Sequence, residues 1–190
     1  MKTILVVGDR ESGKDDLLEF VLDRGKKVLP KFGYLRFDDF LVKDVYRTYN
    51  KNLKGIRKFQ VDFQKKVTKA FEEMKKEHNN IIINGHFFAE LRHGFMPLMS
   101  QELFKVFKPD ALIIIELYPQ KVDPRFKMFK KRDPINIRNL RLQQDITRKF
   151  ATMYISSGDV MLRVVQVNKD DVKQAFTEVM ETVKFVISEG

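Results

Sequence analysis

The chain has 190 residues, 43% of them hydrophobic, with a net charge of +10 and no Cys. This length suits one well-buried core but is short for two independent domains, and the hydrophobic fraction excludes a disordered chain. Without Cys there is no disulfide framework, thiolate nucleophile or Cys-ligated zinc. No apolar run approaches the roughly eighteen residues of a membrane span, and the first residues lack a signal peptide's features, so we expect a cytoplasmic protein with no membrane partner.

Four continuous apolar runs are typical of strands buried on both faces of a parallel sheet: residues 3–7, 81–83, 111–117 and 160–165. A weaker fifth strand is predicted at residues 27–29. Helical periodicity lies between the runs, in a segment that ends at Gly25, around residues 59–74 and again over residues 172–186. This alternation predicts an α/β fold in one domain, residues 1–190, with helices on both faces of the sheet.

The carboxyl ends of the predicted strands should form the ligand-binding edge of the sheet. Parallel strands end at the same edge, and open α/β sheets bind ligands there. Three segments follow strand ends, at residues 8–15, 84–86 and 116–119. We therefore expect these three segments to lie close together.

Residues 8–16, with the sequence GDRESGKDD, directly follow the first predicted strand and nearly match a phosphate-binding loop. Gly8, Gly13 and Lys14 fit the pattern Gly-x-x-x-x-Gly-Lys-Ser/Thr. In such a loop the glycines let backbone N–H groups point at a phosphate at the start of a helix, and the Lys reaches the terminal phosphates. We therefore assign Gly8, Ser12, Gly13, Lys14 and Asp15 to a candidate site for the phosphates of a nucleoside triphosphate.

Asp15 stands where the pattern has a neutral hydroxyl. The stretch from residue 8 to residue 16 carries four acidic and two basic residues, a net charge of −2, which is unusual for an anion site. Asp15 could bind Mg²⁺ directly, because this hard cation accepts carboxylate oxygen. Alternatively, its carboxylate occupies the phosphate position or satisfies N–H groups of the first helical turn. The sequence leaves these alternatives open.

Arg138, Arg141, Asp145 and Arg148 recur at steps of three, four and three, which places them along one side of a helix. Guanidinium groups match phosphate geometry, so the stripe could clamp a transferring phosphoryl group. The alternative is surface arginines with an intrahelical Asp partner. An apolar face beside the stripe is predicted to hold the helix on the core, formed by Leu142, Ile146, Phe150 and Met153.

Asn84 and His86 follow the predicted strand at residues 81–83. His86 either faces a ligand or is a packed, hydrogen-bonded histidine. Asn84 stands where a strand-end Asp often holds Mg²⁺ or its water, and an amide brings no charge to that place.

The positive charge is concentrated in residues 120–149, which hold ten Lys or Arg and three Asp, a net +7. Such a segment suits phosphate-rich partners. RNA or DNA binding through this segment is therefore kept as a hypothesis.

Several segments together resemble those of the archaeal-type adenylate kinases, a branch of the P-loop nucleoside monophosphate kinases. GHFFAELRHGFMP, residues 85–97, is similar to that family's His followed by a Gly-aromatic-aliphatic-Pro segment. KPDALIIIEL, residues 108–117, and DITRKFATMY, residues 145–154, resemble two further family segments, a strand and a helix. KFGYLRF, residues 31–37, and IRKFQVDFQ, residues 56–64, resemble the monophosphate side. The likeness spans nearly the whole chain.

This resemblance implies a P-loop kinase-like, three-layer αβα fold with about five parallel strands in the order 2-3-1-4-5 and a short lid over residues 125–138. It implies Mg²⁺-dependent transfer of a phosphoryl group from ATP to AMP, without a covalent enzyme intermediate, and a tendency to form homo-oligomers. It also implies that residues 8–14 bind the phosphates of ATP and that Arg57 faces the monophosphate. Arg125 and Arg132 would flank the lid, and Arg148 would contact the transferring group. The full site assignment joins these residues to those singled out above. The residues assigned to catalysis are Lys14, Arg125, Arg132 and Arg148. Those assigned to the substrate are Arg57, His86, Arg138 and Arg141.

Three positions depart from the family pattern. Asp15 replaces Ser or Thr, Asn84-Gly85-His86 replaces Asp-Thr-His, and Pro134 stands where a second Arg of an Arg-x-Arg pair is expected. Two of the three concern metal binding. The leading hypothesis is therefore a nucleoside monophosphate kinase, and the alternatives are a paralogue without catalysis that binds nucleic acid or protein, and a module that binds nucleotide without turnover.

Overall fold

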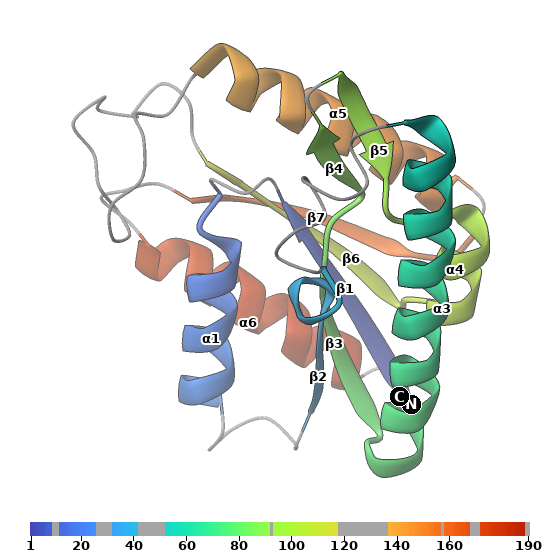
Figure 1. Cartoon of the computed structure of the whole chain (residues 1–190). Coiled ribbons are helices and arrows are strands. Elements are labelled where there is room, and N and C mark those ends of the chain that lie inside the picture. Colours follow the sequence, from blue (N-terminus) through green and yellow to red (C-terminus); the bar gives the residue numbers. More distant parts are fainter. Residues whose placement is uncertain are drawn as a thin grey trace.

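A computed structural model describes residues 1–8, 12–25, 32–41, 52–91, 93–117, 137–156, 158–167 and 172–188. It contains a five-stranded parallel sheet with helices on both faces (Figure 1). The strands of this sheet are β1 (Lys2–Gly8), β2 (Gly33–Arg36), β3 (Asn80–Gly85), β6 (Ala111–Leu117) and β7 (Met161–Val167). The architecture is the three-layer α/β fold predicted from the sequence.

The strands lie in the order β2-β3-β1-β6-β7. Counted in chain order among these five strands alone, this is 2-3-1-4-5, because β4 (Phe88–Leu91) and β5 (Gly94–Pro97) pair with each other in a separate antiparallel hairpin. Strands β1, β3 and β6 occupy the middle of the sheet and are buried along almost their whole length. Burial on both faces explains why their sequences are continuous apolar runs.

Within the described ranges, two helices pack on one face of the sheet and three on the other (Figure 1). The first pair is α1 (Lys14–Gly25) and α6 (Val172–Ser188), and the second set is α3 (Leu53–Glu77), α4 (Gln101–Phe107) and α5 (Ile137–Ile155). A short 3-10 helix, η1 (Phe37–Asp39), follows β2. The helix predicted to end at Gly25 does end there. Among the described helices, none has the length and apolar character needed to cross a membrane.

The fifth strand of the sheet is β2, four residues from Gly33 to Arg36. The strand predicted at residues 27–29 lies outside the described residues. The sequence Gly-Tyr-Leu-Arg carries a weak apolar signal. Gly33 is required by packing, since a Cβ there would lie 2.6 Å from the side chain of Met74 in α3. A short edge strand under a helix therefore escapes a search for apolar runs.

Helix α5 turns a different face to the core than the sequence predicted. Leu142 and Met153, assigned to the buried face, are 48% and 41% exposed. The face that packs on the sheet includes two polar side chains, and its residues are Leu140, Gln144, Thr147, Ala151 and Tyr154. Gln144 can be buried because its Nε2 donates a hydrogen bond to the carbonyl oxygen of Leu117, 2.8 Å away at the end of β6. The prediction was wrong for Leu142 and Met153 because it counted only apolar residues, whereas Phe150 does pack against the core as predicted.

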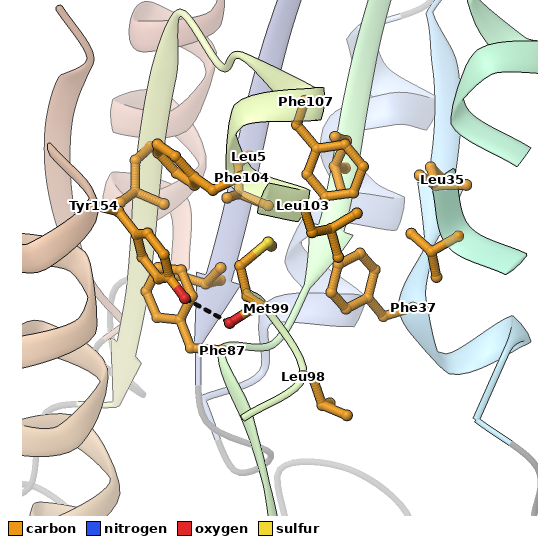
Figure 2. Packing of buried hydrophobic residues seen from close by; sticks show 14 of the residues in the cluster. Leu5, Leu35, Phe37, Phe87, Leu98, Met99, Leu103, Phe104, Phe107 and Tyr154 are labelled. Atoms are coloured by element: carbon orange, nitrogen blue, oxygen red, sulfur yellow. Dashed lines mark hydrogen bonds between the residues drawn. The ribbon is translucent and has the colours of Figure 1, made fainter. Parts of the chain in front are cut away.

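Aromatic packing fixes α5 against the segment that follows the hairpin (Figure 2). The ring of Tyr154 stacks on Phe104 of α4 at a centroid distance of 4.7 Å, and its hydroxyl donates to the carbonyl oxygen of Met99 at 2.5 Å. Burial raises the pKa of Tyr154 to about 12, so this hydroxyl stays protonated and able to donate well into the alkaline range. These contacts hold α5 in a fixed position over the sheet.

Candidate active site

The turn from β1 into α1 has the backbone features of a phosphate-binding loop, as far as its described residues extend. A Cβ on Gly8 would lie 2.5 Å from the carbonyl oxygen of Ile115 in β6, so only glycine fits between the two strands here. Gly13 has a φ of 73°, a left-handed conformation that favours glycine. Ser12 is buried, and its hydroxyl accepts a hydrogen bond from the backbone N–H of Lys14. Residues 9–11 lie outside the described part of the chain.

Lys14, the first residue of α1, is almost fully buried, with 3% of its surface exposed. Its ammonium group donates to the carboxylate of Asp15 at 2.8 Å and to the side-chain carbonyl of Asn84 at the end of β3. Burial lowers the pKa of Lys14, and the charge of Asp15 opposes this shift. The ammonium group is therefore held at the carboxyl edge of the sheet, between β1 and β3.

Asp15 accepts hydrogen bonds from both Lys14 and Asn84, the second at 2.9 Å from Nδ2. Burial raises the pKa of this carboxyl, but the charge of Lys14 and the two hydrogen bonds outweigh it and bring the pKa to about 2. The carboxylate is 41% exposed. Asp15 thus supplies the counter-charge of Lys14, and it remains accessible from solvent.

The ion pair predicts a dependence of stability on pH. Because the folded pKa of Asp15 lies near 2 against a reference of 3.8, the carboxylate stabilises the fold fully above pH 4 to 5, and this stabilisation is lost as the pH falls toward 2. Chemical unfolding measures the free energy of unfolding of the native protein and of Asp15→Asn. The difference between the two free energies should become smaller from pH 5 to pH 2. The same substitution at Asp39, exposed in η1, is the control. A difference in free energy of unfolding that stays constant over this range would contradict the ion pair of Lys14 and Asp15.

The end of β3 connects the loop with β2. Nδ2 of Asn84 also donates to the hydroxyl of Tyr34 at 2.9 Å. Nδ1 of His86 lies 3.2 Å from the carbonyl oxygen of Gly8, and its Nε2 lies 3.5 Å from a carboxylate oxygen of Asp38. The hydrogen bond from His86 lowers the pKa of Asp38. The side chain of His86 is therefore hydrogen-bonded, as one of the two sequence alternatives expects, and it lies beside the loop.

At the end of β6, Arg148 of α5 forms a bidentate ion pair with Glu116. Its Nε and Nη2 donate to the two carboxylate oxygens at 2.7 and 2.6 Å. The side chain of Glu116 is 3% exposed and that of Arg148 is 50% exposed. This pair raises the pKa of Arg148, and it leaves Nη1 outside the paired edge of the guanidinium. Arg148 is thus held in a fixed orientation at the same edge of the sheet as Lys14.

The other arginines assigned from the sequence are exposed side chains away from Lys14 in the chain, or they lie outside the described residues. Arg57 lies exposed on α3, on the opposite face of the sheet from α1. Arg138 and Arg141 lie exposed near the start of α5. Arg125 and Arg132 lie outside the described residues, with all of the expected lid but its last two positions. Sequence reasoning missed Tyr34 and Asp38, because it did not find β2, and it missed that Glu116 binds Arg148.

The donor set at the loop suits a hard divalent cation better than a soft one. Asp15, Asn84 and Ser12 offer oxygen atoms, and these are the ligands that Mg²⁺ prefers. Within the described ranges there is no cluster of three or more His, Cys, Asp or Glu that could hold a metal ion by itself. A cation at this place would therefore need phosphate oxygens or water to complete its shell, which is how Mg²⁺ is usually bound with nucleotides.

Comparisons with known proteins agree with this geometry. A family model described as AAA domain matches residues 12–141, more than half of the chain. The adenylate kinase of Pyrococcus furiosus is 25% identical over 98% of this chain and 97% of its own length. That of Thermoplasma acidophilum is 22% identical over 85% and 87%.

Solved structures of P-loop kinases share the fold. The thymidylate kinase of Candida albicans has a TM-score of 0.59 at 13% identity and covers 97% of this chain and 91% of its own. Deoxyadenosine kinase from M. mycoides, with bound dATP, has a TM-score of 0.56 at 14% identity and covers 97% and 100%. The phosphate-loop geometry, the strand order and these matches lead to one conclusion. The chain belongs to the AAA domain family, as a divergent relative of the archaeal adenylate kinases.

Proposed function

We propose that this protein is a nucleoside monophosphate kinase that transfers the γ-phosphoryl group of ATP to AMP in the presence of Mg²⁺. The observation that carries the proposal is the buried ammonium group of Lys14 at the glycine-lined turn between β1 and α1. The adenylate kinases of Pyrococcus furiosus and Thermoplasma acidophilum, similar to this chain over most of its length, support AMP as the acceptor.

In the proposed reaction a phosphate oxygen of AMP attacks the γ-phosphorus of ATP, and the bond from that phosphorus to the bridging oxygen breaks, which leaves two ADP. Such transfer needs positioning and charge stabilisation more than covalent chemistry. When bound, Mg²⁺ neutralises charge on the phosphate oxygens. Ser12 and Asp15 would hold it, and Lys14 would bind the terminal phosphates of ATP.

Arg148 would contact the transferring group through the part of its guanidinium that Glu116 does not engage. Donors held in place before the reaction lower its barrier, because no reorganisation is needed when charge develops. Arg125 and Arg132 are proposed to flank a lid over the phosphates. Arg57, His86, Arg138 and Arg141 are proposed to face the monophosphate.

The test measures ADP formation from ATP and AMP by ³¹P NMR, with and without Mg²⁺. The proposal expects ADP to appear only when ATP, AMP and Mg²⁺ are all present. Replacing AMP by dTMP tests which acceptor is used, since a thymidylate kinase shares the fold. Nucleotide binding without turnover would favour a binding module. Salt-sensitive RNA binding that survives Lys14→Met, again without turnover, would favour the nucleic-acid hypothesis.

A further inference from the structure

Asp15 and Asn84 touch each other at the position where P-loop proteins hold their divalent cation. In P-loop NTPases that cation is commonly held by the hydroxyl group that follows the loop Lys and by an Asp carboxylate on a neighbouring strand. Here the residue after Lys14 is an Asp, and the residue at the end of β3 is an Asn. Their side chains are joined by a 2.9 Å hydrogen bond from Asn84 to Asp15.

The backbone places the two residues where such ligands would lie. Strand β3 pairs directly with β1, and Asn84 stands opposite Val6, two residues before the strand ends at Gly8. Asp15 lies in the first turn of α1. Asn84 is buried, at 3% exposure, whereas the Asp15 carboxylate is 41% exposed. The negative charge is thus carried by the helix, on the open side of the contact.

The charges at this contact are balanced by a single carboxylate. Lys14 is buried and donates to both side chains, so it needs one anionic partner close by. A carboxylate at both positions would place two like charges in direct contact, and a carboxylate at neither would leave the buried ammonium without a carboxylate in hydrogen-bonding contact. Asn84 fits the existing arrangement because its amide donates to Asp15 while its carbonyl accepts from Lys14.

We propose that, compared with the usual P-loop arrangement, the two ligand positions of the cation site have exchanged their roles. The anionic oxygen belongs to Asp15 on the helix, and the neutral oxygen belongs to Asn84 on the strand. Asp15 supplies the carboxylate that binds the divalent cation of the bound nucleotide, and Asn84 supplies the neutral group. The proposal rests on the proposed function only in requiring that a Mg²⁺–nucleotide complex binds at this loop. Because Lys14 already engages Asp15, the cation gains access to that oxygen when phosphate takes over Lys14. Cation and nucleotide therefore bind as one unit.

The experiment is a double-mutant cycle on ATP affinity, measured by calorimetry with and without Mg²⁺ on the native protein, Asp15→Thr, Asn84→Asp and the double variant. In the native protein Mg²⁺ should raise the affinity by about tenfold or more, within the usual range of coupling between two ligands. Asp15→Thr should lose this enhancement, and the double variant should regain it to within about threefold of the native protein. Asp16→Thr, an exposed neighbour in the same helical turn, should keep it.

A second variant and a second measurement keep the test decisive if Asn84→Asp folds poorly. Asp15→Asn removes the charge and keeps the shape, so it should also lose the Mg²⁺ enhancement. Electron paramagnetic resonance of Mn²⁺ should detect bound cation in the native protein only when ATP is present. Neither readout depends on catalysis, so Mg²⁺-enhanced binding without turnover would refute the kinase proposal and leave the exchange intact.

Three results would overturn the exchange. The first is that Asp15→Thr raises ATP affinity equally with and without Mg²⁺, which would make Asp15 a plug in the phosphate site. The second is a double variant in which Mg²⁺ enhances ATP affinity no more than it does in Asp15→Thr. The third is a native protein whose ATP affinity does not respond to Mg²⁺.

Discussion

Lys14→Met should lower the rate of ADP formation by about a hundredfold to a thousandfold, the usual cost of losing one preorganised donor at a site of developing charge. Lys14 is buried at the carboxyl edge of the sheet, where Asp15 and Asn84 hold its ammonium group in place. The substitution also leaves the Asp15 carboxylate without its cation, which should weaken ATP binding through repulsion of the phosphates. Initial rates and calorimetric titration of ATP measure the two effects separately.

The matched control for this substitution is Lys69→Met, on a side chain that is 79% exposed on α3. It removes the same charge from the surface and should change neither rate nor affinity by more than about twofold, because exposed charges are strongly screened. A Lys14→Met protein that retains more than a tenth of the native rate would rule out the assigned role of Lys14.

Arg148→Ala should reduce both the rate and the stability. The rate should fall by about a hundredfold, because an oriented guanidinium at the sheet edge is lost. The free energy of unfolding should fall by about 2 kcal/mol, since the carboxylate of Glu116, 3% exposed, is left buried without a partner. Urea denaturation and initial rates measure these losses, and Lys149→Ala, exposed and next in the chain, is the control.

The double variant Arg148→Ala/Glu116→Gln separates the two effects. Removing the charge of Glu116 should restore most of the lost stability, because no unpaired buried ion remains. The rate should stay low, because the guanidinium is still absent. Recovery of the rate along with the stability would mean that Arg148 acts only by holding α5 on β6.

The central strands could be predicted from the sequence because burial on both faces leaves a continuous apolar run, as in the residues of β6 from Ala111 to Leu117. The hairpin of β4 and β5 was missed because each strand has four residues and includes polar or special positions such as Glu90 and Pro97. The face of α5 was misjudged because a buried Gln144 hydrogen-bonds to the sheet. Apolar periodicity cannot reveal a polar residue that is buried by such a bond.

The candidate site could be predicted in part, because strand ends of a parallel sheet must meet at one edge. This places Lys14 and Asn84 near each other without any knowledge of their side-chain contacts. Which side chains contact each other at the site could not be predicted from the sequence. The pairing of Arg148 with Glu116 spans 32 positions in the chain and depends on how α5 is rotated over β6. The sequence offered an intrahelical partner, Asp145, as the alternative.

The hydrogen bond between Asn84 and Asp15 also limits how this chain can change during evolution. A single substitution that creates a carboxylate at position 84 places it against Asp15, and a single substitution that removes the carboxylate at position 15 leaves the ammonium of Lys14 without its anion. We therefore expect each one-step change to be unfavourable and the two changes together to be tolerated. Chains related to this one should carry an acidic residue at one of these two positions and a neutral residue at the other. Substitutions at the two positions should therefore occur together.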